Sequence, residues 1–165
     1  MSEPYRGILS EHVRHEIDHW LAKFPPDQKR SAVLAALREV QHENRGYLTV
    51  ELMDAVAQYL GLEPIDVYEV ATFYSMFETK PVGRHSVSVC TNISCMLRGA
   101  DEIVAHVEKK LGAKLGESTP DGKFYLKPEE ECLAGCCGAP MMQVDHVYHE
   151  HLTPARVDQI LDALD

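Results

Sequence analysis

The sequence lacks any long apolar run, since no stretch of about 18 apolar residues occurs in it, and we expect no membrane-spanning helix. Its first residues, MSEPYRGILSEH, do not combine a basic patch with an apolar core, so we expect no secretory signal peptide. Basic residues are in the minority, with 16 Lys and Arg against 26 Asp and Glu and a formal net charge of −10. This balance argues against binding to the phosphate backbone of nucleic acids.

Recognisable catalytic motifs are missing as well. Serine and histidine residues are scattered without the pattern of a nucleophile and its base, and no C-x-x-C opens an expected helix, which argues against thioredoxin-type dithiol chemistry. His12, His15 and His19 share one helical face, but that face lies opposite the apolar one, and no carboxylate or cysteine completes a metal site. We expect these histidines to face solvent.

The first half of the chain, residues 1–80, shows apolar residues at helical spacing. The pattern predicts four helices joined by short turns, over residues 10–24, 27–46, 49–61 and 64–77. Ser10 suits the N-cap of the first helix, and Pro64 suits the first turn of the fourth. Four short helices with short connections predict a small antiparallel bundle.

The second half, residues 81–165, follows a predicted linker at residues 80–83 and changes character. Alternating polar and apolar residues predict a strand over 85–90, and amphipathic patterning predicts helices over 99–113 and 153–165. Further strands are expected over 123–128 and within 140–149. The overall expectation is an α+β protein in which a helical bundle precedes an α/β sandwich with a mixed sheet.

Five cysteines lie between positions 90 and 137, four of them as two close pairs. Cys90 and Cys95 form a C-x4-C pair, and Cys132 and Cys136 form a C-x3-C pair. Disulfides are not expected without an export signal, whereas soft thiolates select zinc, copper(I) or iron–sulfur clusters. The spacing alone leaves a structural zinc site and an iron–sulfur cluster equally open.

Small residues beside the second pair, Gly135, Gly138 and Ala139, are expected to offer backbone amides to cluster sulfurs. The fifth cysteine, Cys137, is expected to be a small buried side chain with no ligand role.

Two motifs, VCTNISCMLRG and ECLAGCCGAPMM, closely resemble the thioredoxin-like [2Fe–2S] subunit of NADH–quinone oxidoreductase, known as the E subunit in bacteria and the 24 kDa subunit in mitochondria. The stretch GYLTVELMDAVAQYLGLEPIDVYEVATFYSMF also looks like the N-terminal helical segment of that family. The resemblance covers residues 8–164 and favours iron–sulfur over zinc. It implies a thioredoxin-like domain over residues 81–165 with one [2Fe–2S] cluster held by Cys90, Cys95, Cys132 and Cys136.

The same resemblance implies a function. The chain would be an electron-transfer component of NADH:quinone oxidoreductase that exchanges an electron with the flavin of the larger, NADH-binding subunit. FMN and NADH would be bound by that partner, and the chain alone would not be catalytic. Other subunits of the hydrophilic arm would be further partners, and the location would be the cytoplasmic side of the inner membrane, without membrane insertion. The alternatives are the equivalent subunit of a soluble NAD-linked formate dehydrogenase or hydrogenase and, in another class, a non-redox zinc-stabilised interaction module.

Two more groups of residues carry expectations. Glu129, Glu130 and Glu131 directly precede Cys132 and are candidates for holding the reduction potential low, since nearby negative charge opposes reduction. An aromatic cluster ends the fourth expected helix and is predicted either to pack between the two halves or to form an exposed patch buried by the flavoprotein partner. Its members are Phe73, Tyr74, Met76 and Phe77.

Overall fold

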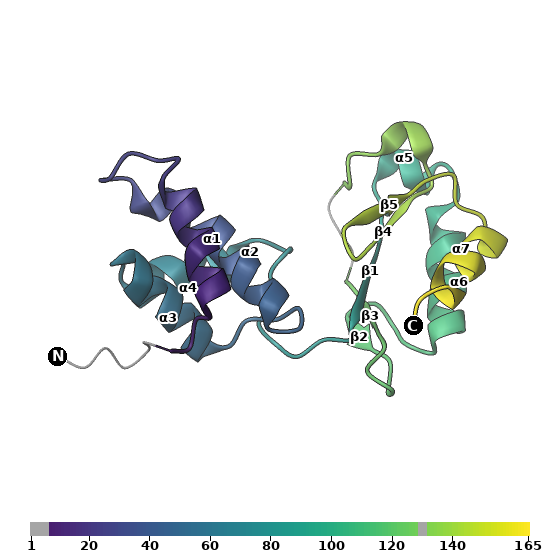
Figure 1. The fold of residues 1–165 in the computed structure, drawn as a ribbon. Helices are drawn as coiled ribbons and strands as arrows, with labels where there is room; N and C mark the ends of the chain where they lie inside the picture. Colours follow the sequence, from purple (N-terminus) through teal and green to yellow (C-terminus); the bar gives the residue numbers. More distant parts are fainter. Residues whose placement is uncertain (1–6, 129–131) are drawn as a thin grey trace. The chain divides into compact units, whose positions relative to one another are not determined.

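The structure, a computed structural model, describes residues 7–128 and 132–165. The chain divides into two compact units, Met1–Pro81 and Val82–Asp165, and each is described by itself (Figure 1). Within the described residues, no helix is long and apolar enough to cross a membrane.

The first unit is a bundle of four α-helices and one 3₁₀ turn. In chain order these elements are α1 Glu11–Leu21, η1 Lys29–Ala32, α2 Val33–Glu43, α3 Val50–Leu60 and α4 Pro64–Phe73. Each helix contributes apolar side chains to one buried cluster, which includes Ile17, Leu37, Val56 and Val67. Burying a side chain of this size stabilises a fold by roughly 1.5–3 kcal/mol, so the bundle is held mainly by this cluster.

Local signals position the ends of these helices. The Ser10 hydroxyl accepts a hydrogen bond from the Val13 amide at 3.1 Å, as expected for an N-cap, and Thr49 caps α3 in the same way through the Leu52 amide at 3.3 Å. The second helix differs from expectation. It begins at Val33 rather than near residue 27, because the preceding residues form the separate 3₁₀ turn η1.

The end of the bundle is fastened by the side chain of Gln41. Its Nε2 donates to the Met76 carbonyl at 3.0 Å, and its Oε1 accepts from the Glu78 amide at 2.8 Å. These bonds hold the segment after α4 so that Phe77 is 6% exposed within the bundle cluster. Phe73, by contrast, is 79% exposed, and the neighbouring Tyr74 and Met76 are exposed as well.

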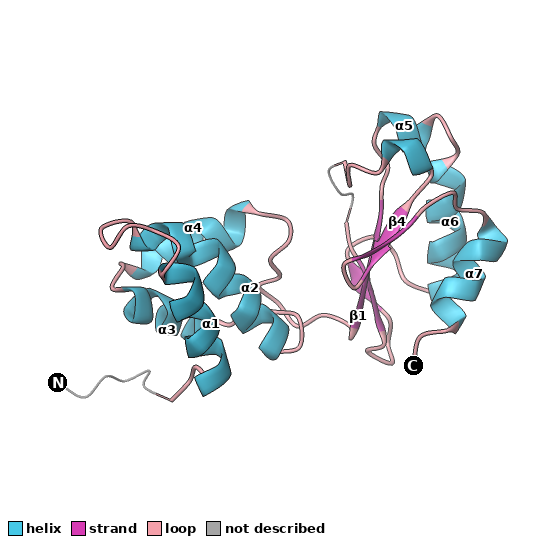
Figure 2. Ribbon diagram, turned by 45° about the horizontal axis from the view of Figure 1, so that its top comes forward, coloured by secondary structure: helices cyan, strands magenta, loops and turns pink. Residues whose placement is uncertain are grey.

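The second unit is a five-stranded mixed sheet with helices (Figure 2). Its strands are β1 His85–Val89, β2 Glu117–Ser118, β3 Phe124–Leu126, β4 Met142–Val144 and β5 Val147–His149. Its helical elements are α5 Ile93–Met96, α6 Ala100–Leu111, the 3₁₀ turn η2 Cys136–Gly138 and α7 Pro154–Asp162. The strand order is β2-β3-β1-β4-β5, with β1 parallel to β3 and the other pairs antiparallel. The predicted α+β class and mixed sheet are confirmed.

One face of this sheet is covered by α6 and α7, which lie on the same side of it in Figures 1 and 2. The register aligns Val87 of β1 with Leu126 of β3 and with Val144 of β4. These side chains form a buried cluster with Val107 of α6 and Leu161 of α7. Because side chains alternate along a strand, Ser88 points to the opposite face.

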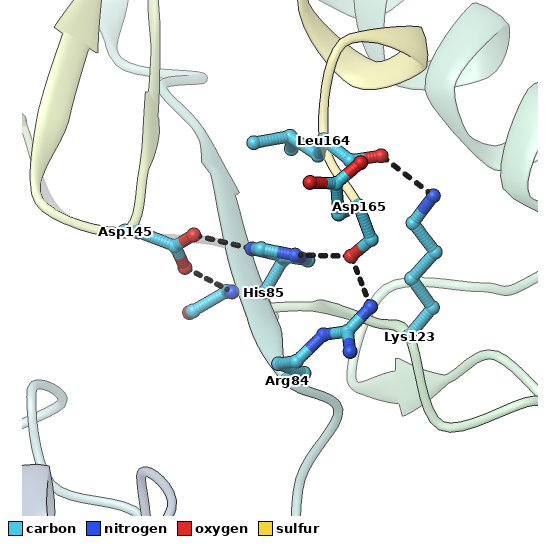
Figure 3. A network of polar contacts seen from close by, with 7 residues as sticks. Arg84, His85, Lys123, Asp145, Leu164 and Asp165 are labelled. Carbon is cyan, nitrogen blue, oxygen red and sulfur yellow. Dashed lines mark hydrogen bonds and ion pairs between the residues drawn. The ribbon is translucent and has the colours of Figure 1, made fainter.

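A polar network ties the end of α7 to the start of β1 (Figure 3). His85 Nδ1 lies 2.5 Å from one carboxylate oxygen of Asp145, and the other oxygen of that carboxylate accepts a hydrogen bond from the Ser86 amide at 2.9 Å. His85 Nε2 lies 3.1 Å from the Asp165 carbonyl oxygen, which also accepts from Arg84, and Lys123 Nζ donates to the Leu164 carbonyl at 2.8 Å. The network fixes the first residue of β1, the strand that leads to Cys90.

Candidate metal centre

The four cysteines predicted as ligands lie on two loops of the second unit. Cys90 directly follows β1, and Cys95 lies in α5; both are buried. Cys132 lies shortly before η2, and Cys136 begins it; both are exposed. The buried pair is therefore contributed by the strand end and the short helix, and the exposed pair by the later loop.

The first pair is positioned by backbone hydrogen bonds. The Cys90 amide donates to the Met141 carbonyl at 3.1 Å, which joins this residue to the segment that enters β4. The Asn92 side chain accepts from the Ile93 amide at 3.0 Å and caps α5. Together these contacts place Cys95 one short turn after Cys90.

The second pair is brought together by a tight turn. The sulfurs of Cys132 and Cys136 are 3.7 Å apart, and the Ala134 amide donates to the Cys132 sulfur at 3.4 Å. Two thiolates that bind one tetrahedral metal ion at about 2.3 Å are about 3.8 Å apart, so this separation suits a shared metal ion. Ala134 has a left-handed φ of 61°, a conformation that costs a residue with a Cβ about 1–2 kcal/mol.

Two glycines allow the turn to pack closely against its surroundings. A β-carbon at Gly135 would lie 2.3 Å from the Met141 sulfur, and one at Gly138 would lie 2.4–2.5 Å from three carbons of Glu150. Neither distance is compatible with a real side chain. Glycine at these two positions therefore allows the loop to lie close to Met141 and Glu150.

The thiols influence one another's protonation. Burial opposes ionisation of Cys90, but hydrogen bonds from the Leu133 and Asn92 amides and from neighbouring thiols outweigh it and lower the pKa of Cys90. Burial and the neighbouring Cys90 raise the pKa of Cys95 to about 11, although the Met141 amide acts in the opposite direction. The buried pair thus favours one thiolate, on Cys90.

The exposed pair is coupled to the buried one. The Ala134 amide favours the Cys132 thiolate, but the nearby Cys136 thiol, partial burial and the charge of Cys90 outweigh it and raise the pKa of Cys132. The Cys132 thiol hydrogen-bonds to Cys90, and the charge of Cys136 acts on Cys95, so the two pairs influence each other's protonation. Among the described residues, no three His, Cys, Asp or Glu side chains are grouped so that they could hold one metal ion.

Two expectations about this loop are wrong. The amides of Gly138 and Ala139 do not donate to sulfur, because they close the turn by donating to the Gly135 and Cys136 carbonyls at 2.9 and 3.3 Å. Cys137 is exposed rather than buried, since the buried position of η2 is taken by Gly138. Glu129, Glu130 and Glu131 lie outside the described residues, so their predicted influence on the potential stays a prediction.

Two kinds of residue at this site were not predicted from the sequence. The amides of Asn92, Leu133, Ala134 and Met141 are the donors to sulfur, and a backbone donor has no signature in a single sequence. Glu150 reaches the loop from the segment after β5. The three histidines on α1 are exposed as predicted.

These residues fit an iron–sulfur cluster. A [2Fe–2S] cluster takes four thiolates, two for each iron, and the cysteines form two neighbouring pairs. Amides aimed at three of the four sulfurs stabilise the thiolate form that a metal requires.

Comparison with known proteins decides the relationship. Residues 17–165 match the model of the thioredoxin-like [2Fe–2S] ferredoxin family. The chain belongs to this family. Membership confirms the predicted thioredoxin-like fold and the [2Fe–2S] cluster as the cofactor.

Similarity to individual named proteins supports the predicted relationship. The chain is 46% identical to the E subunit of NADH-quinone oxidoreductase from Rickettsia conorii over 87% of this chain and 86% of the relative. It is 44% identical to an E subunit of the same enzyme from Rhizobium meliloti over 92% of this chain and 88% of the relative. The mitochondrial NADH dehydrogenase [ubiquinone] flavoprotein 2 of Dictyostelium discoideum is 41% identical over 90% of this chain and 60% of its own length. The predicted kinship with subunits of this oxidoreductase is confirmed.

A solved structure shares the fold. An NAD+-reducing [NiFe]-hydrogenase in its air-oxidised state aligns with a TM-score of 0.67 and 22% identity, over 79% of this chain. The chain spans about a fifth of that hydrogenase chain, since 22% of it is covered. At this identity the likeness concerns the fold alone.

Proposed function

We propose that this chain is an electron-transfer component of an NADH–quinone oxidoreductase, with one [2Fe–2S] cluster held by Cys90, Cys95, Cys132 and Cys136. In this proposal residues 81–165 hold the cluster and residues 1–80 form a docking bundle. The electron comes from a flavin bound, together with NADH, by a partner subunit. The chain has no separate catalytic step of its own.

One observation carries the proposal: two cysteine pairs become neighbours in a chain that closely matches the E subunits named above over most of its length. A zinc site and a [2Fe–2S] cluster both use four thiolates, so the donor set alone does not separate them. The relatives favour the cluster, and so does the amide hydrogen bonding of three sulfurs.

The residues have distinct tasks in this function. A bound [2Fe–2S] cluster supplies one-electron chemistry. The four thiols would have to lose their protons to hold iron, and the raised pKa of Cys95, about 11 in the free chain, opposes this loss. The Leu133, Asn92, Met141 and Ala134 amides then offset the negative charge of the thiolates. Burial of Cys90 and Cys95 keeps water from one side of the centre.

The test is cluster loading of the full chain and of single Cys→Ser variants. Iron and acid-labile sulfide are assayed, and electron paramagnetic resonance (EPR) is recorded after reduction with dithionite. We expect about two irons and two sulfides in the parent chain, an EPR signal on reduction, and loss or alteration of the signal in each variant of Cys90, Cys95, Cys132 and Cys136.

Cys137→Ser is the matched control, because Cys137 is exposed like its neighbour Cys136 but lies outside the proposed ligand set. Its cluster content and EPR signal should equal those of the parent chain. A colourless protein that contains zinc and no iron would contradict the cluster and support the zinc-stabilised alternative. A Cys137→Ser variant that loses the signal while Cys136→Ser keeps it would contradict the ligand assignment.

The proposed partner is the subunit that binds flavin and NADH. Next to Cys95, helix α5 and the residue after it expose Ile93, Met96 and Leu97, with exposed fractions of 68%, 47% and 74%. Exposed apolar side chains beside a redox site suit burial by a protein partner, because a partner that covers them excludes water from the site. Phe73 on the bundle is a second candidate contact.

The proposed location is the cytoplasmic side of the inner membrane, where the chain would be peripheral through its complex and would also contact other hydrophilic-arm subunits. Affinity purification from the native host tests this placement. Co-purified membrane subunits of the oxidoreductase would support it. Formate dehydrogenase or hydrogenase subunits in their place would favour the soluble alternative.

A further inference from the structure

A carboxylate from a distant part of the sequence lies against the loop that carries Cys136. Glu150 belongs to the segment between β5 and α7. This segment runs beside the loop, since the His151 amide donates to the Gly138 carbonyl at 2.7 Å and the Leu152 amide to the Pro140 carbonyl at 2.9 Å. Two backbone hydrogen bonds therefore fix the distance between Glu150 and the loop.

The side chain of Glu150 points along the loop rather than away from it. A β-carbon built on Gly138 would lie 2.4 Å from the Glu150 carboxyl carbon, and one built on Gly135 would lie 3.4 Å from Glu150 Oε1. The two glycines that leave this space lie on either side of Cys136. Because adjacent Cα atoms are about 3.8 Å apart, the carboxylate lies within about 9 Å of the Cys136 Cα.

The charge of Glu150 is not compensated by the described part of the chain. Among those residues, no hydrogen-bond donor and no basic group contacts its carboxylate, and the side chain is exposed. His149 and His151 flank Glu150 in the same segment, and Arg156 on α7 acts electrostatically on His149 while its guanidinium donates to Gln159. Cys136 also differs from the other three ligands, whose sulfurs accept backbone amides.

We propose that the carboxylate of Glu150 lowers the reduction potential of the cluster, an inference that rests on the ligand set proposed above. Reduction adds one electron to a centre that four thiolates already make anionic, and no bond forms or breaks. The donor is a reduced flavin in the assembly and dithionite in the experiment. A fixed negative charge nearby raises the free energy of the reduced form more than that of the oxidised form.

Coulomb's law sets the size of the effect. If the carboxylate-to-Cα separation of about 9 Å at Cys136 is taken as the distance to the centre, a unit charge changes the equilibrium between the two forms roughly threefold at an effective dielectric constant of about 60 and about twentyfold at 20. Glu150 is exposed, so the lower part of this range applies. Added salt should shrink the effect, because exposed charges are screened within a Debye length.

The test is an EPR-monitored redox titration of the cluster-loaded full chain and its Glu150→Gln variant. At the midpoint potential of the parent chain, the ratio of reduced to oxidised cluster should rise about three- to tenfold in Glu150→Gln. A tenfold change corresponds to about 59 mV for a one-electron couple. The difference between the two proteins should narrow as the ionic strength is raised.

Two variants serve as controls. Glu150→Asp keeps the charge and should retain most of the parent potential. Glu117→Gln removes the same charge at β2 and should leave the potential unchanged. The reason is that the cysteine loops lie near α5, at the other end of the unit (Figure 1). Iron and sulfide are assayed in each variant before the titration.

The outcomes are separable. A raised potential in Glu150→Gln alone supports the proposal. An unchanged potential overturns it, and so does an equal shift in Glu117→Gln. Loss of the cluster from Glu150→Gln also overturns it, because a charge that only tunes the potential is not needed to hold iron. A parent chain that shows no EPR signal after reduction would instead contradict the proposed function.

Discussion

Gly138 should tolerate no side chain, because the aliphatic part of the Glu150 side chain lies where the β-carbon of residue 138 would be. In Gly138→Ala the new methyl group would lie 2.4–2.5 Å from the Cβ, Cγ and Cδ atoms of Glu150, and the two segments must move apart. Such overpacking costs about 1–3 kcal/mol. Loss of the 2.7 Å hydrogen bond between the His151 amide and the Gly138 carbonyl adds about 0.5–1.5 kcal/mol.

The expected loss of unfolding free energy is therefore about 1.5–4.5 kcal/mol, confined to the second unit. With a urea m-value of about 2 kcal/mol/M, the middle of the usual range, the unfolding midpoint of this unit should fall by about 1–2 M. The assay is urea unfolding of the reduced, cluster-free chain, with amide NMR signals of β1 reporting the second unit. The fluorescence of Trp20, the single tryptophan, reports the bundle and should be unchanged.

A double-mutant cycle separates steric conflict from other causes. Glu150→Gly removes all three conflicting atoms, so the second substitution should recover at least about 1 kcal/mol of the loss caused by Gly138→Ala. Gly116→Ala is the matched control, because nothing lies within 4 Å of its β-carbon position and only its left-handed φ of 84° is penalised. A Gly138→Ala chain no less stable than Gly116→Ala, or one that Glu150→Gly does not rescue, would refute the argument.

Three further changes have defined outcomes. Phe73→Ser should weaken co-purification with the flavoprotein partner without lowering the urea midpoint. The control Val50→Ser, at a site that is 56% exposed, should change neither the co-purification nor the urea midpoint. Asp145→Ala should destabilise the second unit by about 1–3 kcal/mol, because the Ser86 amide and His85 lose their acceptor, while Asp145→Asn should cost less in the same urea assay. Cys95 has a folded pKa of about 11 against an ordinary 9.0, so its contribution to the stability of the cluster-free chain should fall as pH rises from 9 to 11, by about 1.4 kcal/mol at pH 10. Thiolate absorbance should show a group titrating near pH 11 that Cys95→Ser removes, and a titration unchanged by that substitution would contradict the assignment.

The local parts of the fold were predictable because their signals are local. Ser10, Thr49 and Pro64 each mark a helix start within one turn of sequence, and the structure uses all three. The strand over 85–89 follows from the alternation of apolar residues. The start of the second helix was misplaced, because the residues before Val33 adopt a 3₁₀ turn that the apolar pattern does not distinguish from an α-helix.

The exposure of single side chains was harder to predict, because it depends on contacts far away in sequence. Phe73 and Phe77 lie one turn apart in the same apolar segment, yet the first is 79% exposed and the second 6%. The difference arises from Gln41, which bonds to the backbone on both sides of Phe77. Cys137 was misjudged for a similar reason, since its neighbour Gly138 takes the buried position against Glu150.

The candidate site depends both on local sequence signals and on contacts between residues far apart in the sequence. The spacing within each cysteine pair is a local signal, and it predicts two close pairs of thiols that the structure brings into electrostatic contact. The groups that govern their charge are set by tertiary structure: amides of Leu133 and Met141 reach the sulfurs of Cys90 and Cys95 from another loop. Donor type and spacing therefore predict a thiolate-bound metal centre but not the choice between zinc and an iron–sulfur cluster, which the family resemblance favours. The energetics of the centre depend on backbone and carboxylate groups that only the fold brings to the site.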